Sequence, residues 1–161
     1  MHPIKDQWQG HACKSLFCLL SLWIWLSLFG AATPTFAQPH PGDLISPVNS
    51  PAACITVSGA LDTLPALQTE VCRSKPEQYW QVDDTGRWQS GANTNYCLAR
   101  KSSGSWTLTV RPCTDPLTLY LQPDPTHPAI YTVVGDNTVL DNYGSEVGLW
   151  SKHGGANQQW R

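Results

Sequence analysis

Four cysteines are spaced in a way that predicts two local disulfide bonds. Cys54 and Cys72 lie about 17 residues apart, and Cys97 and Cys113 repeat that spacing. A cysteine pair of this kind closes a small loop, which restricts the unfolded chain and stabilises the fold. We therefore expect the bonds Cys54–Cys72 and Cys97–Cys113.

The same register continues into a third segment, in which both cysteine positions have changed. The matching positions, about 40 residues further on, hold Val139 and Lys152. Joint loss is what a disulfide within each repeat would leave behind, because a single remaining thiol has no partner. The four placed cysteines indicate an oxidising compartment.

The other reactive residues do not form a catalytic or metal-binding pattern. The histidines after residue 37 are His40, His127 and His153, and none has the spacing of a metal-ligand motif. Ser151 could be combined with His153 and Asp141, but no strained Gly-x-Ser-x-Gly turn presents the serine. Asp83 and Asp84 are adjacent, so they cannot flank a glycosidic bond. We expect no enzyme activity, no cofactor and no metal.

The first 37 residues have the pattern of a secretory signal peptide. Residues 1–15 are polar, residues 16–32 are almost continuously apolar, and Thr35-Phe36-Ala37 offers small residues to a signal peptidase. We expect cleavage after Ala37, removal of Cys13 and Cys18 with the leader, and export to the extracellular or periplasmic space. The alternative is an uncleaved membrane anchor, for which the apolar run is at the short limit.

The remainder, residues 38–161, has the size of one domain and a mildly acidic charge. It holds eight Lys or Arg against eleven Asp or Glu, without a basic stripe. This distribution argues against nucleic acid and anionic membranes as partners, so a membrane would be reached only through glycoconjugates or an uncleaved leader. Residues 38–43 are rich in proline, and we expect a mobile lead-in before the domain at residues 44–161.

Large apolar residues return at a near-constant interval through this domain. Trp80, Leu121 and Trp160 are about 40 residues apart, and two of them close a Gln-x-Trp motif. Short β-branched or aromatic runs alternate with turn residues, and no ten-residue stretch has an uninterrupted helical stripe. The pattern predicts an all-β protein. Three repeats are too few for a propeller and too compact for a solenoid, which leaves a β-trefoil of three repeats with two intra-repeat disulfides.

These motifs resemble those of the ricin-type (R-type) lectin β-trefoil, the ricin B chain-like domain, over residues 44–161. The shared features are a Cys-Leu or Cys-Ile opening, a second cysteine and a closing Gln-x-Trp. The third repeat matches best, with the segments Val139-Leu140-Asp141, Val147-Gly148-Leu149-Trp150 and Ala156-Asn157-Gln158-Gln159-Trp160. The resemblance implies non-covalent carbohydrate binding, with up to one shallow site in each repeat.

The resemblance also implies which residues would hold the sugar. The family's site combines an acidic residue, an aromatic platform and an asparagine before the closing glutamine, here Asp141, Trp150, Asn157 and Gln158. A sugar stacks its C–H face on a ring, and carboxylate and amide groups hold its hydroxyls. We expect Asp141 and Trp150 to be surface residues. The alternative without a ligand is that Asp141 only forms a turn and that Gln158, like Gln78, is a structural hydrogen-bonder.

The first two repeats lack this set. The corresponding positions hold Thr56, Glu70 and Glu77 in the first repeat and Ala99, Arg111 and Thr118 in the second. Only the third repeat is therefore expected to bind. It departs from the family in its short loop of nine residues from Asp141 to Trp150, which leaves Tyr143 and Glu146 near the site. The chain also stops one residue after Trp160, so we expect a barely formed last strand beside Leu44-Ile45.

The leading hypothesis is a secreted lectin domain with one site for a galactose-type or related glycan or polysaccharide. One alternative is a degenerate trefoil that has lost sugar binding and acts as a structural or protein-interaction domain. A third possibility is a trefoil protease inhibitor with an exposed reactive loop, such as Asp62-Thr63-Leu64-Pro65 or residues 123–128. The inhibitor would not need the Asn-Gln-Gln-Trp closing set, which counts against it.

Overall fold

Three antiparallel hairpins with one shared register form the framework of the domain. The computed structural model describes residues 42–161, so the expected leader and most of the lead-in lie outside the described residues. The hairpins are β2 (Ala53–Ser58) with β3 (Ala66–Val71), β6 (Asn93–Arg100) with β7 (Leu108–Pro112), and β10 (Thr138–Tyr143) with β11 (Glu146–Ser151). Cys54 pairs with Glu70, Cys97 with Arg111, and Val139 with Trp150. The three repeats are thus structurally equivalent.

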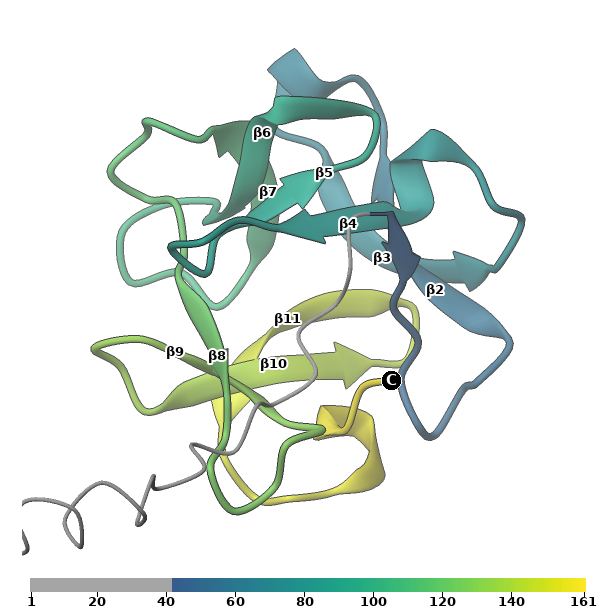
Figure 1. Ribbon diagram of the computed structural model, residues 1–161, viewed down its shortest axis with the longest axis vertical. Coiled ribbons are helices and arrows are strands. Elements are labelled where there is room, and N and C mark those ends of the chain that lie inside the picture. Colours follow the sequence, from purple (N-terminus) through teal and green to yellow (C-terminus); the bar gives the residue numbers. More distant parts are fainter. Residues whose placement is uncertain (1–41) are drawn as a thin grey trace, which may run out of the picture. The chain divides into compact units, whose positions relative to one another are not determined.

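Shorter strands link the hairpins into two sheets. They are β1 (Asp43–Leu44), β4 (Tyr79–Val82), β5 (Trp88–Ser90), β8 (Leu121–Pro123) and β9 (Tyr131–Val133). One sheet has the order β1-β4-β5-β6-β7 and the other β2-β3-β11-β10-β9-β8 (Figure 1). Three 3₁₀ turns, η1 (Leu61–Thr63), η2 (Pro76–Gln78) and η3 (Ala156–Gln158), complete the described part, which contains no α-helix. No helix there is long and apolar enough to cross a membrane. The all-β prediction is confirmed.

The core gathers the residues that recur along the sequence. Trp80, Leu121 and Trp160 are all buried in one apolar cluster. The indole Nε1 of Trp80 donates to the Ile55 carbonyl at 3.1 Å, and that of Trp160 donates to the Leu140 carbonyl at 3.1 Å. Each ring therefore fills the core and satisfies a carbonyl of its own repeat. The β-trefoil prediction rests on this recurrence, and it is confirmed.

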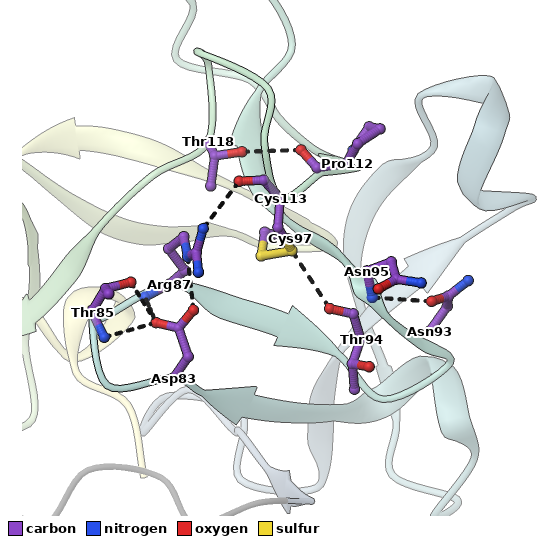
Figure 2. The surroundings of a disulfide bond; sticks show 10 residues. All are labelled: Asp83, Thr85, Arg87, Asn93, Thr94, Asn95, Cys97, Pro112, Cys113 and Thr118. Carbon is purple, nitrogen blue, oxygen red and sulfur yellow. Dashed lines mark hydrogen bonds and ion pairs between the residues drawn. A yellow bond between two sulfur atoms is a disulfide. The ribbon is translucent and has the colours of Figure 1, made fainter.

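Both predicted disulfides are present. Cys54 bonds to Cys72 and Cys97 to Cys113, with Cα–Cα distances of 5.0 and 4.8 Å. Around the second bond, Arg87 donates through Nη1 to the Cys113 carbonyl at 3.3 Å (Figure 2). The same guanidinium donates through Nε to Asp83 Oδ2 at 2.7 Å. The disulfide is therefore tied to the β4–β5 turn.

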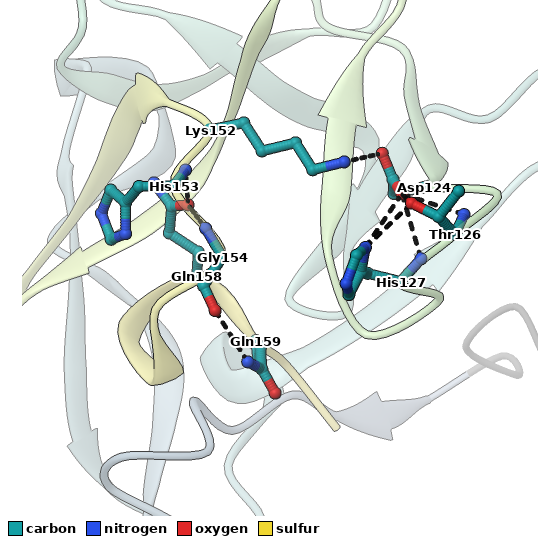
Figure 3. Close-up of polar contacts among 8 residues, drawn as sticks. All are labelled: Asp124, Thr126, His127, Lys152, His153, Gly154, Gln158 and Gln159. Carbon is teal, nitrogen blue, oxygen red and sulfur yellow. Dashed lines mark hydrogen bonds and ion pairs between the residues drawn. The ribbon is translucent and has the colours of Figure 1, made fainter.

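An ion pair takes the place of the disulfide in the third repeat. Lys152, at the position of the lost cysteine, reaches from the end of β11 to Asp124 Oδ2 at 2.6 Å (Figure 3). Asp124 Oδ1 accepts from the backbone N–H groups of Thr126 and His127. The hydrogen bond from Lys152, followed by that from Thr126, holds the pKa of Asp124 well below its usual range. The pair ties the hairpin to the β8–β9 turn.

The C-terminal residues pair with residues 46–48, close to the start of the described chain. Ser46 and Arg161 exchange two backbone hydrogen bonds, and Val48 N–H donates to the Gln159 carbonyl at 2.8 Å. Leu44 instead pairs with Tyr79 of β4. The expectation that the last strand lies beside Leu44-Ile45 is therefore wrong by two residues. The reason is that β1 is used to cover the edge of β4, so the C-terminus pairs with the next segment.

Candidate functional site

Gln158 is the centre of a buried polar network in the third repeat. Its Nε2 donates to Asp141 Oδ2 at 2.8 Å and to the Ser151 carbonyl at 3.0 Å, and its Oε1 accepts from the backbone N–H of His153 at 2.8 Å. A buried amide needs such partners, and this one is fully supplied. Gln158 therefore has a structural role, in agreement with the alternative prediction that it is a structural hydrogen-bonder.

Asp141 lies in the middle of β10 with both carboxylate oxygens bonded. Asn157 Nδ2 donates to Oδ1 at 2.8 Å, and Gln158 donates to Oδ2. The Asp141 side chain is only 1% exposed, so the expectation of a surface residue is wrong. A buried carboxylate is tolerated when hydrogen bonds replace its water, and the two amides of η3 do so. The sequence motif showed the three partners but not their depth.

His153 covers this carboxylate from the solvent side. Its Nε2 lies 3.6 Å from Asp141 Oδ2, and its side chain is 47% exposed. The backbone N–H of Gly155 donates to His153 Nδ1 at 3.1 Å. A Cβ at Gly155 would come within 2.8 Å of the imidazole Cε1, so a larger residue there would displace the ring. His153 is therefore a lightly held cover over Asp141.

Trp150 stands on the same hairpin as Asp141 and remains accessible. It lies opposite Val139 and is 46% exposed. Its ring meets Tyr143 edge to face, with centroids 5.8 Å apart, and Trp106 with centroids 4.4 Å apart. Trp106 comes from the β6–β7 loop of the second repeat, so a repeat-by-repeat comparison could not find it. Its exposure, 43%, is the signal that singles it out.

Tyr143 packs against Trp150 and lies on β10, the strand that carries Asp141. Its hydroxyl donates to the Leu149 carbonyl, and its ring occupies the space above Gly148. Burial, reinforced by the charge of Asp141, raises the pKa of Tyr143 to about 12. The short loop behind this arrangement is a two-residue turn at 144–145. Gly144 has a φ of 83°, and the turn has the pattern of type II′, in which only its first central residue takes a positive φ.

The first repeat has the same scaffold without the carboxylate. Gln78 Nε2 donates to Thr56 Oγ1 at 3.1 Å and to the Val71 carbonyl at 2.9 Å. Its Oε1 accepts from the backbone N–H of Arg73. These contacts match those of Gln158, with a hydroxyl in the place of Asp141. Glu70, at the platform position, is an exposed anion rather than a ring.

In the second repeat, the residue at the platform position is Arg111, whose guanidinium is bonded within its own repeat. Arg111 donates to the carbonyls of Arg100 and Lys101 and forms an ion pair with Asp115 at 3.1 Å. Ala99, at the acidic position, is buried and offers no polar group. Thr118 donates to the Pro112 carbonyl at 3.4 Å. Among the three repeats of the described chain, only the third combines a carboxylate, amides and an exposed ring.

A family model for the ricin-type β-trefoil lectin domain matches residues 42–160. The chain belongs to this family. Lectin domains of this type are carbohydrate-binding and non-catalytic. A comparison of the sequence with curated proteins gives no match.

Solved structures similar to this trefoil come from plants, animals and fungi. The agglutinin from Abrus precatorius is 21% identical over 76% of this chain and 46% of its own, with a TM-score of 0.62. The C-half of an earthworm R-type lectin, solved with GalNAc, is 17% identical over 75% of this chain and 96% of its own, with a TM-score of 0.61. The Macrolepiota procera ricin B-like lectin, solved with lactose, is 21% identical over 76% of this chain and 96% of its own, with a TM-score of 0.60. At these identities the likeness shows the fold.

Proposed function

We propose that this trefoil lectin domain binds a galactose-type glycan through its third repeat alone. Asp141 and Asn157 would accept and donate hydrogen bonds at the sugar hydroxyls, and Trp150 would stack on the apolar sugar face. Gln158 would hold the carboxylate in place rather than touch the ligand. The observation that carries the proposal is the fixed Asp141 carboxylate, bonded on each oxygen by an amide of η3.

Several features support carbohydrate over other small ligands. Each carboxylate oxygen can accept more than one hydrogen bond, so Asp141 keeps acceptor capacity beyond its two amide donors. Fixing the oxygens in advance lowers the entropy lost on binding. The similar earthworm and Macrolepiota lectins were solved with GalNAc and lactose, both of which contain a galactose-type ring.

The Asp141 carboxylate is buried next to the His153 ring, which gives His153 a part in binding. Because Asp141 is 1% exposed, a sugar hydroxyl reaches it only when the His153 ring swings aside. One side-chain hydrogen bond, from the Gly155 N–H, holds the ring there, and exposed side chains change rotamer rapidly. A shallow site of this kind is expected to bind one monosaccharide with a Kd near ~1 mM, so useful affinity needs clustered copies or multivalent glycans.

Two variants of the third repeat test the proposal. Trp150→Ala is expected to abolish retention on a galactose matrix without shifting the thermal midpoint, because the ring is half exposed. Asp141→Asn is expected to abolish retention and also to lower the midpoint, because it disturbs a buried amide–carboxylate network. The measurements are affinity chromatography and thermal unfolding of the same preparations.

The first repeat supplies matched controls. Thr56→Ala and Glu70→Ala change the equivalent positions and are expected to leave retention unchanged. Loss of retention in these variants, together with normal binding by Trp150→Ala, would show that the sugar site lies in the first repeat and contradict the proposal.

The closed carboxylate also favours a second candidate function. A trefoil whose Asp141 is fully covered could serve as a structural or protein-interaction domain without binding sugar. A glycan array on the folded wild-type domain separates the two candidates. If the domain binds no glycan on the array at millimolar concentration, this second function is favoured.

We also propose that the domain is secreted after removal of residues 1–37. The polar head, the apolar run and the small residues ending at Ala37 support it, as do the two disulfides, which need an oxidising compartment to persist. Protein recovered from the medium or periplasm is expected to begin at Gln38 on N-terminal sequencing. Recovery of the apolar run in a membrane fraction would support the anchor instead.

A further inference from the structure

A hollow next to the candidate sugar site is built by two different repeats. It has a volume of about 140 Å³ and lies between the β10–β11 hairpin and the Trp106-Thr107 segment that precedes β7. Trp150, the proposed platform of the sugar site, and the adjacent Tyr143 line the hollow, whereas Asp141 and Asn157 do not. The hollow is therefore a separate surface that adjoins the candidate site through two shared rings.

Its lining suits one sugar ring. Trp106, Tyr143 and Trp150 are between 43% and 46% exposed and meet edge to face, so each ring keeps accessible surface. Aromatic faces attract the C–H groups of a pyranose. Exposed Glu146 and Thr107 stand at the rim, where a carboxylate and a hydroxyl can bond to sugar hydroxyls. The volume is below the roughly 300 Å³ of pockets for drug-sized ligands.

The backbone positions the rings before any ligand arrives. Leu149 N–H donates to the Trp106 carbonyl at 2.8 Å, which joins the second-repeat loop to β11. Gly148 leaves room for both neighbours, since a Cβ there would come within 2.8 Å of the Tyr143 ring and 2.9 Å of the Trp106 carbonyl. The aromatic cluster thus depends on a glycine and a cross-repeat hydrogen bond, which are features of a preorganised surface.

We propose that this hollow is a second sugar subsite and that the ligand is an oligosaccharide of at least two units. The inference rests on the proposed function of the third repeat. The terminal unit lies at Asp141 and Asn157, and the next unit stacks on Trp106 within the hollow. Glu146 disfavours an anionic lipid surface as the occupant of the same rings. Specificity for the glycan then depends on a residue of the second repeat, although that repeat has no site of its own.

Titration of the secreted protein with sugars of increasing length tests the subsite. The probes are methyl α-galactoside, lactose and N-acetyllactosamine. The wild type is expected to bind the disaccharides roughly fivefold more tightly than the monosaccharide, a typical size for one aromatic contact. Trp106→Ala is expected to reduce disaccharide affinity to the monosaccharide level and to leave monosaccharide affinity unchanged. Trp106→Phe, which keeps a ring, is expected to retain most of the difference.

Tyr120→Ala is the matched control, because Tyr120 is an equally exposed aromatic that does not line the hollow. Equal affinity for both sugar lengths, unaffected by Trp106→Ala, would overturn the subsite and leave the proposed function standing. Loss of monosaccharide binding in Trp106→Ala would also overturn it, by placing the ring in the first site. No binding of any probe by the wild type, with binding to phosphatidylserine vesicles through Trp106, would overturn both proposals.

Discussion

Trp160→Ala is expected to unfold the domain or leave it barely folded at 37 °C. The indole is 2% exposed within the central cluster, and its Nε1 satisfies the Leu140 carbonyl at 3.1 Å. Truncating a buried tryptophan costs about 3–5 kcal/mol, a large part of the roughly 5–15 kcal/mol by which such domains are stable. The measurement is the free energy of unfolding in urea, followed by circular dichroism and tryptophan fluorescence.

Trp150→Ala serves as the matched control, since it removes the same side chain from an exposed position on β11. Its unfolding midpoint is expected to stay close to that of the wild type. The backbone of Trp160 also holds the chain end, through its N–H bond to the Ala129 carbonyl at 2.7 Å and its bridge to Pro47. An unfolding free energy for Trp160→Ala within 1 kcal/mol of the wild type, about the effect of an ordinary substitution, would contradict this account.

The fold could be predicted because its signals are periodic. Trp80, Leu121 and Trp160 recur at one interval, and the fold needs one large apolar residue from each repeat in the shared core. The disulfides could be predicted from the same register, because the two cysteine pairs occupy equivalent positions in the first and second repeats. Local patterns and the global fold agree in such a sequence, so reasoning from either gives the same answer.

The candidate site was only partly predictable, for two physical reasons. Residue type identified Asp141, Asn157 and Gln158 as partners, but the burial of Asp141 depends on how the segment after β11, with His153, packs against it. The contact between Trp106 and Trp150 could not be predicted at all, because it crosses between repeats. Contacts of this kind arise from packing and leave no periodic trace. Sugar binding by these residues stays a prediction.

Restoring the lost disulfide is expected to give the largest gain in stability. In the first repeat, Cys72 lies two residues beyond Glu70, the cross-strand partner of Cys54. In the third repeat, Lys152 likewise lies two residues beyond Trp150, the partner of Val139. The double variant Val139→Cys/Lys152→Cys therefore places its two thiols in the strand register of the two native bonds. A loop of this length stabilises by about 3 kcal/mol in the chain-entropy model.

The correct reference for that gain is Val139→Ala/Lys152→Ala, because both double variants lose the ion pair with Asp124. The oxidised double-cysteine protein is expected to exceed this reference by about 3 kcal/mol in the free energy of unfolding. Peptide mapping of non-reduced protein must show the two introduced thiols joined to each other and the native pairs intact. Since Asp124 also accepts from the Thr126 and His127 backbone, its turn is expected to persist without Lys152. Free thiols in the folded double variant would show that the third hairpin departs from the geometry shared by the first two.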